Sequence, residues 1–141
     1  MRRPIFAPND LLASIYSSEI MSEYDAQIIP VVTLADAKKE IQRIGSDPNS
    51  IDIMAPKMIT NVIQISNVKL QDAIIIKQDM LSIGGEVAVP KDTFALHDTN
   101  ANILIIGTLL QHRQLIEKLN RHYPRIQRIS SVLKDMLETK R

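Results

Sequence analysis

The sequence predicts a layered α/β domain in which helices flank a sheet of about four strands. Runs of β-branched residues alternate with amphipathic helical patterns along the 141 residues. All four glycines fall where such a run stops, as expected for a residue that reaches left-handed backbone angles at little cost. Alternation of this kind favours parallel pairing for some strands. A ferredoxin-like α+β sandwich is the alternative fold.

We expect residues 1–26 to form an N-terminal arm and residues 27–141 a single α/β domain. The domain begins with a predicted strand over 27–32, placed at a sheet edge because Pro30 cannot donate to a β-ladder. Thr33 and Asp36 then form a capping-box pattern. The helix that follows has apolar residues at three- and four-residue spacing and stops at Gly45.

Asp47-Pro48 predicts the start of a short helix that Pro56 ends. A β-branched run over 59–65 predicts the next strand. Asn67 is the expected cap of a helix over 69–83, and a short strand over 86–89 follows its two glycines.

The apolar run over 102–106 is typical of a central strand. Thr108 is the expected cap of a helix over 109–121, and Tyr123-Pro124 interrupts the helical pattern. A last amphipathic helix has six apolar residues on one face: Ile126, Ile129, Val132, Leu133, Met136 and Leu137.

Composition excludes several classes of function. Apolar residues make up 45% and charged residues 23%, which is ordinary for a globular protein, but aromatic residues make up only 4%, so the core must be aliphatic. Cysteine is absent, which excludes thiolate nucleophiles and Cys-ligated metals and fits a cytoplasmic protein. No apolar run reaches the roughly 18 residues of a membrane span, so we expect no membrane partner.

Charge is uneven along the chain. Residues 1–108 contain 9 Lys and Arg against 13 Asp and Glu, whereas residues 109–141 contain 8 against 3. The basic C-terminal third favours either solvated helices or contact with an acidic partner. Nucleic acid is the least favoured partner, because acidic charge elsewhere offsets the basic third.

Three positions are candidate ligand contacts. The Gly107-Thr108 turn joins a strand to a helix, and the free N–H groups of a helix N-terminus suit a phosphate or carboxylate. Lys57, a loop lysine after Pro56, could bind an anion, and Glu86, at a strand entrance, could act as a ligand contact or general base. Each also has a structural interpretation: a helix cap, a solvated lysine and an exposed charge.

Other chemistry is not indicated. Neither phosphate-binding glycine motif is present, and no GxSxG nucleophile motif occurs. His97, His112 and His122 lack the spacing of metal ligands, and Asp72 and Asp79 are most simply surface residues of one helix. We therefore expect no catalytic residue, no metal and no cofactor.

Several phrases resemble a known family. They are RIGSDP at 43–48, IDIMAPK at 51–57, IKQDMLSIGGEVAV at 76–89, GTLLQHR at 107–113 and LIEKL at 115–119. Together they resemble the N-terminal extension that precedes the catalytic barrel in some bacterial and archaeal dihydropteroate synthase-like proteins.

The resemblance implies an accessory role. Dihydropteroate synthase joins a pterin diphosphate to p-aminobenzoate in folate synthesis, on a (β/α)₈ barrel of about 250 residues that this chain cannot contain. We expect a non-catalytic domain that docks to a pterin-binding barrel, in cis or in trans, or that helps to form a homo-oligomer. The alternatives are an anion- or small-molecule-binding regulatory module and, last, nucleic-acid binding through the C-terminal helices.

Overall fold

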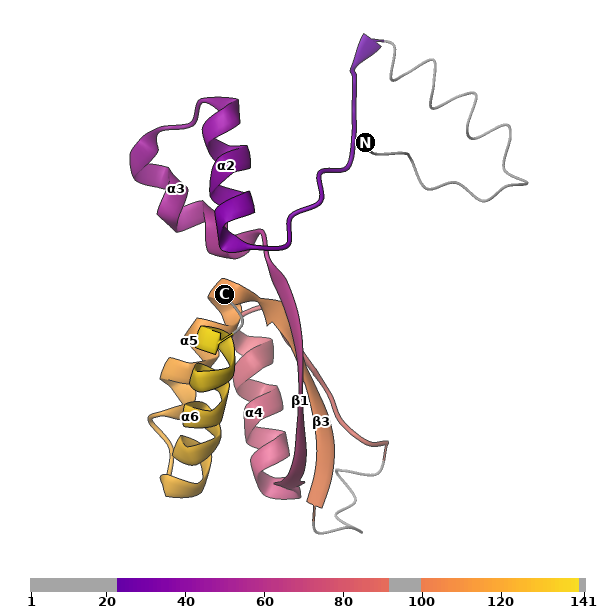
Figure 1. Cartoon of the computed structure of the whole chain (residues 1–141). Coiled ribbons are helices and arrows are strands. Elements are labelled where there is room, and N and C mark those ends of the chain that lie inside the picture. The colour runs from indigo at the N-terminus through magenta and orange to yellow at the C-terminus, as the bar shows by residue number, and fades with distance from the viewer. Residues whose placement is uncertain (1–22, 92–99, 140–141) are drawn as a thin grey trace, which may run out of the picture. The chain divides into compact units, whose positions relative to one another are not determined.

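A computed structural model describes residues 23–91 and 100–139, and Val31–Arg141 form one compact unit. The elements are α2 (Leu34–Ile44), α3 (Pro48–Met54), the 3₁₀-helix η1 (Ala55–Lys57), β1 (Thr60–Lys69), α4 (Leu70–Ser82), β2 (Glu86–Ala88), β3 (Asn100–Thr108), α5 (Leu109–Leu119) and α6 (Pro124–Thr139) (Figure 1). The predicted α/β class is confirmed. The predicted arm lies almost wholly outside the described residues, so its boundary stays a prediction.

The sheet differs from the prediction in size and in strand direction. Within the described residues it has three strands, in the order β1-β3-β2, and both pairings are antiparallel. The expected parallel pairing is wrong, because β3 lies between the two strands that α4 connects. The predicted strand over 27–32 is also wrong, since this segment has no regular structure. Pro30, without an N–H group, cannot donate to a ladder there.

The order of elements corresponds to part of the ferredoxin-like alternative. That fold follows the order β-α-β-β-α-β, and this chain reproduces its first five elements as β1-α4-β2-β3-α5. In the complete fold a fourth strand would then pair with the free edge of the first strand. Here helix α6 follows α5 instead, and β1 remains at the edge of the described sheet.

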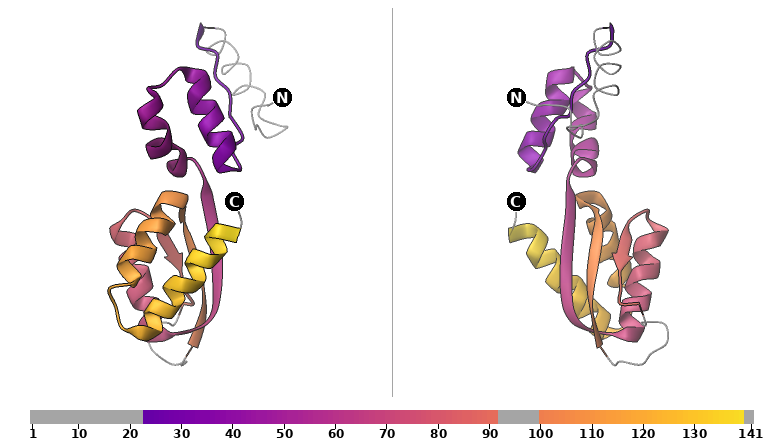
Figure 2. Two further views of the ribbon diagram at one scale, coloured as in Figure 1. Left: turned by 60° about the vertical axis from the view of Figure 1, so that its left-hand side comes forward. Right: turned by 90° about the vertical axis from the view of Figure 1, so that its right-hand side faces the viewer.

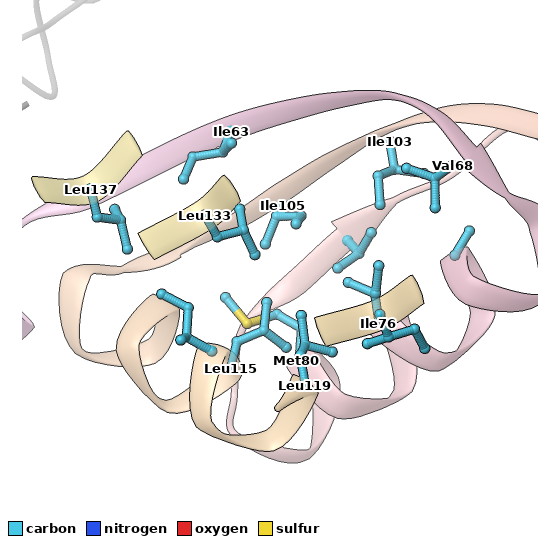
Figure 3. Packing of buried hydrophobic residues seen from close by; sticks show 14 of the residues in the cluster. Ile63, Val68, Ile76, Met80, Ile103, Ile105, Leu115, Leu119, Leu133 and Leu137 are labelled. Carbon is cyan, nitrogen blue, oxygen red and sulfur yellow. The ribbon is translucent and has the colours of Figure 1, made fainter. Parts of the chain in front are cut away.

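Helices α4, α5 and α6 cover one face of the sheet (Figures 1 and 2). The core between them is aliphatic, as predicted, and β3 is the central strand. Ile103 and Ile105 of β3 point into this core (Figure 3), whereas Leu104 between them is 37% exposed. The central strand is thus covered on one face only, and its outward side chains form part of an open apolar face.

Helix boundaries follow the local signals in the sequence. Thr33 and Asp36 form the predicted capping box, with Thr33 Oγ1 accepting from Asp36 N at 3.1 Å. Gly45 ends α2 with φ 83°, in the left-handed region where glycine is favoured. Asp47 caps α3 through its side chain. These ends need no tertiary partner, which explains why the sequence predicts them.

Asn67 is not the cap of α4. The register of β1 against β3 shifts between Ile65 and Val68, so Asn67 belongs to a β-bulge, with φ 60°. Its N–H donates to Asn102 Oδ1 at 3.1 Å. The N-cap is Lys69, which makes no side-chain capping bond. The bulge lets β1 continue past the point at which the sequence predicts its end.

Candidate functional site

The fold brings the predicted site residues to the same end of the sheet. Gly107 and Thr108 form the junction of β3 and α5, and Thr108 lies opposite Thr60 in the register. Glu86 lies opposite Ile106, next to this junction, and Lys57 lies three residues before β1. Their role in ligand binding stays a prediction.

The N–H groups of the Gly107-Thr108 turn are largely used inside the protein. Thr108 N donates to Gln111 Oε1 at 2.9 Å, and Gln111 N donates to Thr108 Oγ1 at 3.1 Å, which completes the predicted cap as a capping box. Leu109 N donates to Ile59 O at 2.8 Å. An anion at this turn would therefore have to compete with three hydrogen bonds that already hold α5 to the sheet.

Gly107 itself is required by close packing. A Cβ at this position would lie 2.5 Å from Met80 Cε, far inside the ordinary contact distance of about 3.5–4.0 Å. Met80 is fully buried. The absence of a side chain at Gly107 thus makes room for a core methionine of α4.

Glu86 is held as an anion. Its Oε1 accepts hydrogen bonds from Lys77 Nζ at 2.9 Å and from Val87 N at 2.8 Å. The Lys77 bond, followed by the Val87 bond, lowers the pKa of the Glu86 carboxyl. A general base at neutral pH needs a raised carboxyl pKa, so this environment favours an ion pair over proton transfer. Lys57 is exposed at the end of η1 and not in the predicted loop.

His112 is buried, although the spacing of the histidines in the sequence, which we considered only for metal binding, did not predict this. It is fully buried in α5, and its Nε2 lies 2.9 Å from Asn61 O of β1. Burial lowers the pKa of His112, although nearby backbone carbonyls oppose the shift. Nε2 therefore donates to Asn61 from a neutral ring, and Nδ1 has no hydrogen-bond partner among the described residues.

Asp72 is not a surface residue, and this prediction is wrong. It is 1% exposed, and its carboxylate accepts from Arg125 Nε at 2.5 Å and Arg125 Nη2 at 2.8 Å. The Tyr123 hydroxyl donates to the same carboxylate. Burial alone would raise the pKa of Asp72, but the hydrogen bonds from Arg125 and Tyr123 outweigh it and the pKa lies below its usual value.

Asp72 escaped the sequence analysis because its partners are 51 and 53 residues away. Two signals were available: an acidic residue in the first turn of a helix, and a Tyr-Pro-Arg turn between the last two helices. Asp79, by contrast, is half-buried and pairs with His122, whose Nε2 lies 2.8 Å from Asp79 Oδ2.

A basic hollow lies beside Asp72, at the start of α4. We use this name for the space of about 250 Å³ around Lys69, Arg125 and Arg128, which Asn67 and Asn100 also line. Arg125 is paired with Asp72, which leaves Lys69 and Arg128 as the other cations of the lining. The hollow is the most cationic of the described depressions and suits a small anion.

Two kinds of arrangement would mark metal or membrane binding among the described residues: clusters of metal ligands and helices long enough to cross a bilayer. Within residues 23–91 and 100–139, no group of three or more His, Asp or Glu side chains is arranged to hold a metal ion. The helices of the same residues lack the length and apolarity that crossing a bilayer requires.

Comparison with curated proteins shows a distant and partial similarity. The chain is 27% identical over 101 residues to the bifunctional dihydropteroate synthase/dihydropteroate reductase of Helicobacter pylori. The aligned region is 72% of this chain but 27% of the relative, so the chain spans about a quarter of that enzyme's length. No family model and no solved structure matches. The similarity is therefore to one part of that enzyme.

Proposed function

We propose that this chain is a non-catalytic accessory domain of a dihydropteroate synthase-like protein and that it docks to the pterin-binding barrel, in the same chain or in another. The alignment supports this, because it covers most of the chain but about a quarter of the bifunctional enzyme. A (β/α)₈ barrel needs about 250 residues. The described residues form a three-stranded antiparallel sheet with helices on one face.

The open face of the sheet is the surface on which docking is best tested. Val62 and Leu104 are 59% and 37% exposed, and the register places Ile106 and Ala88 beside them on the same face. An apolar centre with polar surroundings is typical of a protein interface. Docking of a partner here would cover the side of β3 that α4, α5 and α6 leave open.

The test is association with the barrel protein of the same organism, measured by light scattering after size-exclusion chromatography. We expect a complex, and we expect Leu104→Lys to weaken it about tenfold or more by placing a charge in a desolvated contact. Leu81→Lys is the matched control, because Leu81 is 46% exposed on α4, away from the open face. Absence of any complex with the wild-type chain, or equal losses in both variants, would count against docking.

Binding of an anionic small molecule is the second candidate function, and the basic hollow favours it. Thermal unfolding with phosphate, nucleotides and pterins tests it. An anion at about 100 times its dissociation constant should add about 2.7 kcal/mol to the free energy of unfolding. Arg128→Gln should abolish the shift, and a wild-type protein that no anion stabilises would exclude this function.

A further inference from the structure

We infer that two copies of this domain pair through the outer edge of β1. Strand β1 of one copy then runs antiparallel to β1 of the other, and two three-stranded sheets join into one sheet of six strands. This inference goes beyond the proposed docking to a barrel and does not rest on it. Three observations carry it: the hydrogen-bonding groups of the edge, the groove beside it, and its lack of charge.

The edge of β1 offers backbone groups to another strand. Leu109 N donates to Ile59 O, so Ile59 directs its backbone groups toward β3. Because this direction alternates along an antiparallel strand, Thr60, Val62 and Gln64 direct their N–H and C=O groups away from β3. β1 is the edge of the sheet on that side among the described residues. The chemistry of this edge therefore fits an extended chain.

A groove of about 280 Å³ runs beside the same stretch of β1. One wall of the groove is formed by β1 and the residue before it, through Ile59, Asn61, Val62, Ile63 and Gln64. The other wall is formed by the 32–34 segment and by Met136 and Leu137 of α6. This is the side of β1 on which the ferredoxin-like order places its fourth strand. The groove shows that α6 and the 32–34 segment do not fully close this stretch of the edge.

The composition of β1 favours a second copy as the occupant. No charged residue occurs from Met58 to Val68, so self-pairing brings no like charges together. Natural sheet edges are usually protected by charges, prolines or short strands. The other edge follows that rule, because β2 has three residues, starts at Glu86 and is followed by Pro90-Lys91. A closed barrel has no free edge to offer, so the docking partner proposed above does not fit this site.

The outward-directed residues of β1 define the register. A two-fold axis at Val62 pairs Thr60 of each copy with Gln64 of the other, so that all three outward-directed residues take part in the pairing. The Val62 register also brings together the two copies of Val62, each 59% exposed in the single chain.

The test uses the chain alone. Sedimentation equilibrium should show a reversible dimer of twice 15.9 kDa. Gln64→Pro removes an outward N–H without disturbing the β1–β3 ladder, and Val62→Lys places two like charges at the axis. We expect each to weaken the dimer about tenfold or more, since each change acts twice in a symmetric pair. Leu81→Lys on α4 should leave it unchanged.

Hydrogen exchange supplies a second measurement that a merely misfolded variant would not mimic. The outward amides of Val62 and Gln64 should become protected from exchange as protein concentration rises. The amide of Ile63, which faces β3, should stay protected at every concentration. A wild-type chain that is monomeric up to about 1 mM overturns the inference. So does a dimer that neither substitution weakens, or one in which the Val62 amide exchanges freely. None of these results bears on association with the barrel.

Discussion

The contact between Gly107 and Met80 provides the sharpest test of how the predicted site is built. A Cβ added at Gly107 would lie 2.5 Å from Met80 Cε and 2.9 Å from Gln111 Oε1. Carbon atoms in contact prefer about 3.5–4.0 Å, so the added methyl group overlaps the methionine by about 1 Å. Met80 is fully buried and cannot move into solvent without leaving the core. Gly107→Ala is therefore an overpacking substitution.

The expected magnitudes follow from this geometry. Overpacking a core by one methyl group lowers the free energy of unfolding by about 1–3 kcal/mol. Met80→Ala on its own should lower it by about 2–5 kcal/mol, because it leaves a cavity. In the double variant the new methyl group enters that cavity. The free energy of unfolding lost in the double variant should then be about 1–2 kcal/mol smaller than the sum of the two single losses. The contact of the added methyl group with Gln111 accounts for the part of the Gly107→Ala loss that remains.

Urea unfolding of the wild-type, the two single variants and the double variant, followed by circular dichroism, measures this coupling. Gly45→Ala is the control: Gly45 has φ 83° but no atom within 4 Å of an added Cβ. Its loss, roughly 1 kcal/mol from backbone strain, should be the same with and without Met80→Ala. If Gly107→Ala is neutral, or if its effect and that of Met80→Ala add within about 0.5 kcal/mol, packing does not explain the glycine.

Three further predictions concern two buried titratable groups, His112 and Asp72, and the Tyr123 hydroxyl that donates to Asp72. Because burial lowers the pKa of His112, the unfolded chain binds a proton more readily than the folded one, so stability should fall as pH drops below about 6.5. His112→Gln, which keeps a donor for Asn61 O, should flatten this slope in urea titrations; an unchanged slope would assign it to other groups. The pKa of Asp72 is lowered, so its contribution is present above its usual value of about 3.9 and is lost as pH falls further. Asp72→Asn should therefore make acid unfolding less steep, and Tyr123→Phe should lower stability at pH 7 by about 1 kcal/mol through the lost hydrogen bond; a Tyr123→Phe variant as stable as the wild type would contradict the role given to this hydroxyl.

Much of the fold was predictable from local signals. The helices α2, α3, α4, α5 and α6 were expected close to their observed spans, and the run over 102–106 marked the central strand. The strand predicted over 27–32 failed because its apolar residues matched the pattern of a strand, while Pro30 has no N–H group to donate to a ladder. Local pattern indicates what a segment can form, but pairing decides whether a strand exists.

The candidate site was predictable only in part. Thr108 was expected to cap α5 and does so, but the demand that Met80 places on Gly107 is a contact between residues 27 positions apart. Asp72 looked like a surface residue because helical spacing says nothing about a tyrosine and an arginine from a later turn. Those partners turn an acidic residue of a helix into a buried carboxylate.

The sequence by itself determined the capping boxes of α2 and α5, the glycine at the end of α2, the aliphatic character of the core and the position along the chain of the buried strand around Ile105, since caps, glycines and apolar runs act over a few residues. Tertiary structure alone decided that β3 lies between β1 and β2, that the sheet is antiparallel with one face uncovered, and that Asp72, Tyr123 and Arg125 meet. These features depend on which distant segments pack together. That choice is made by the burial of the whole core, and no single stretch of the chain contains it.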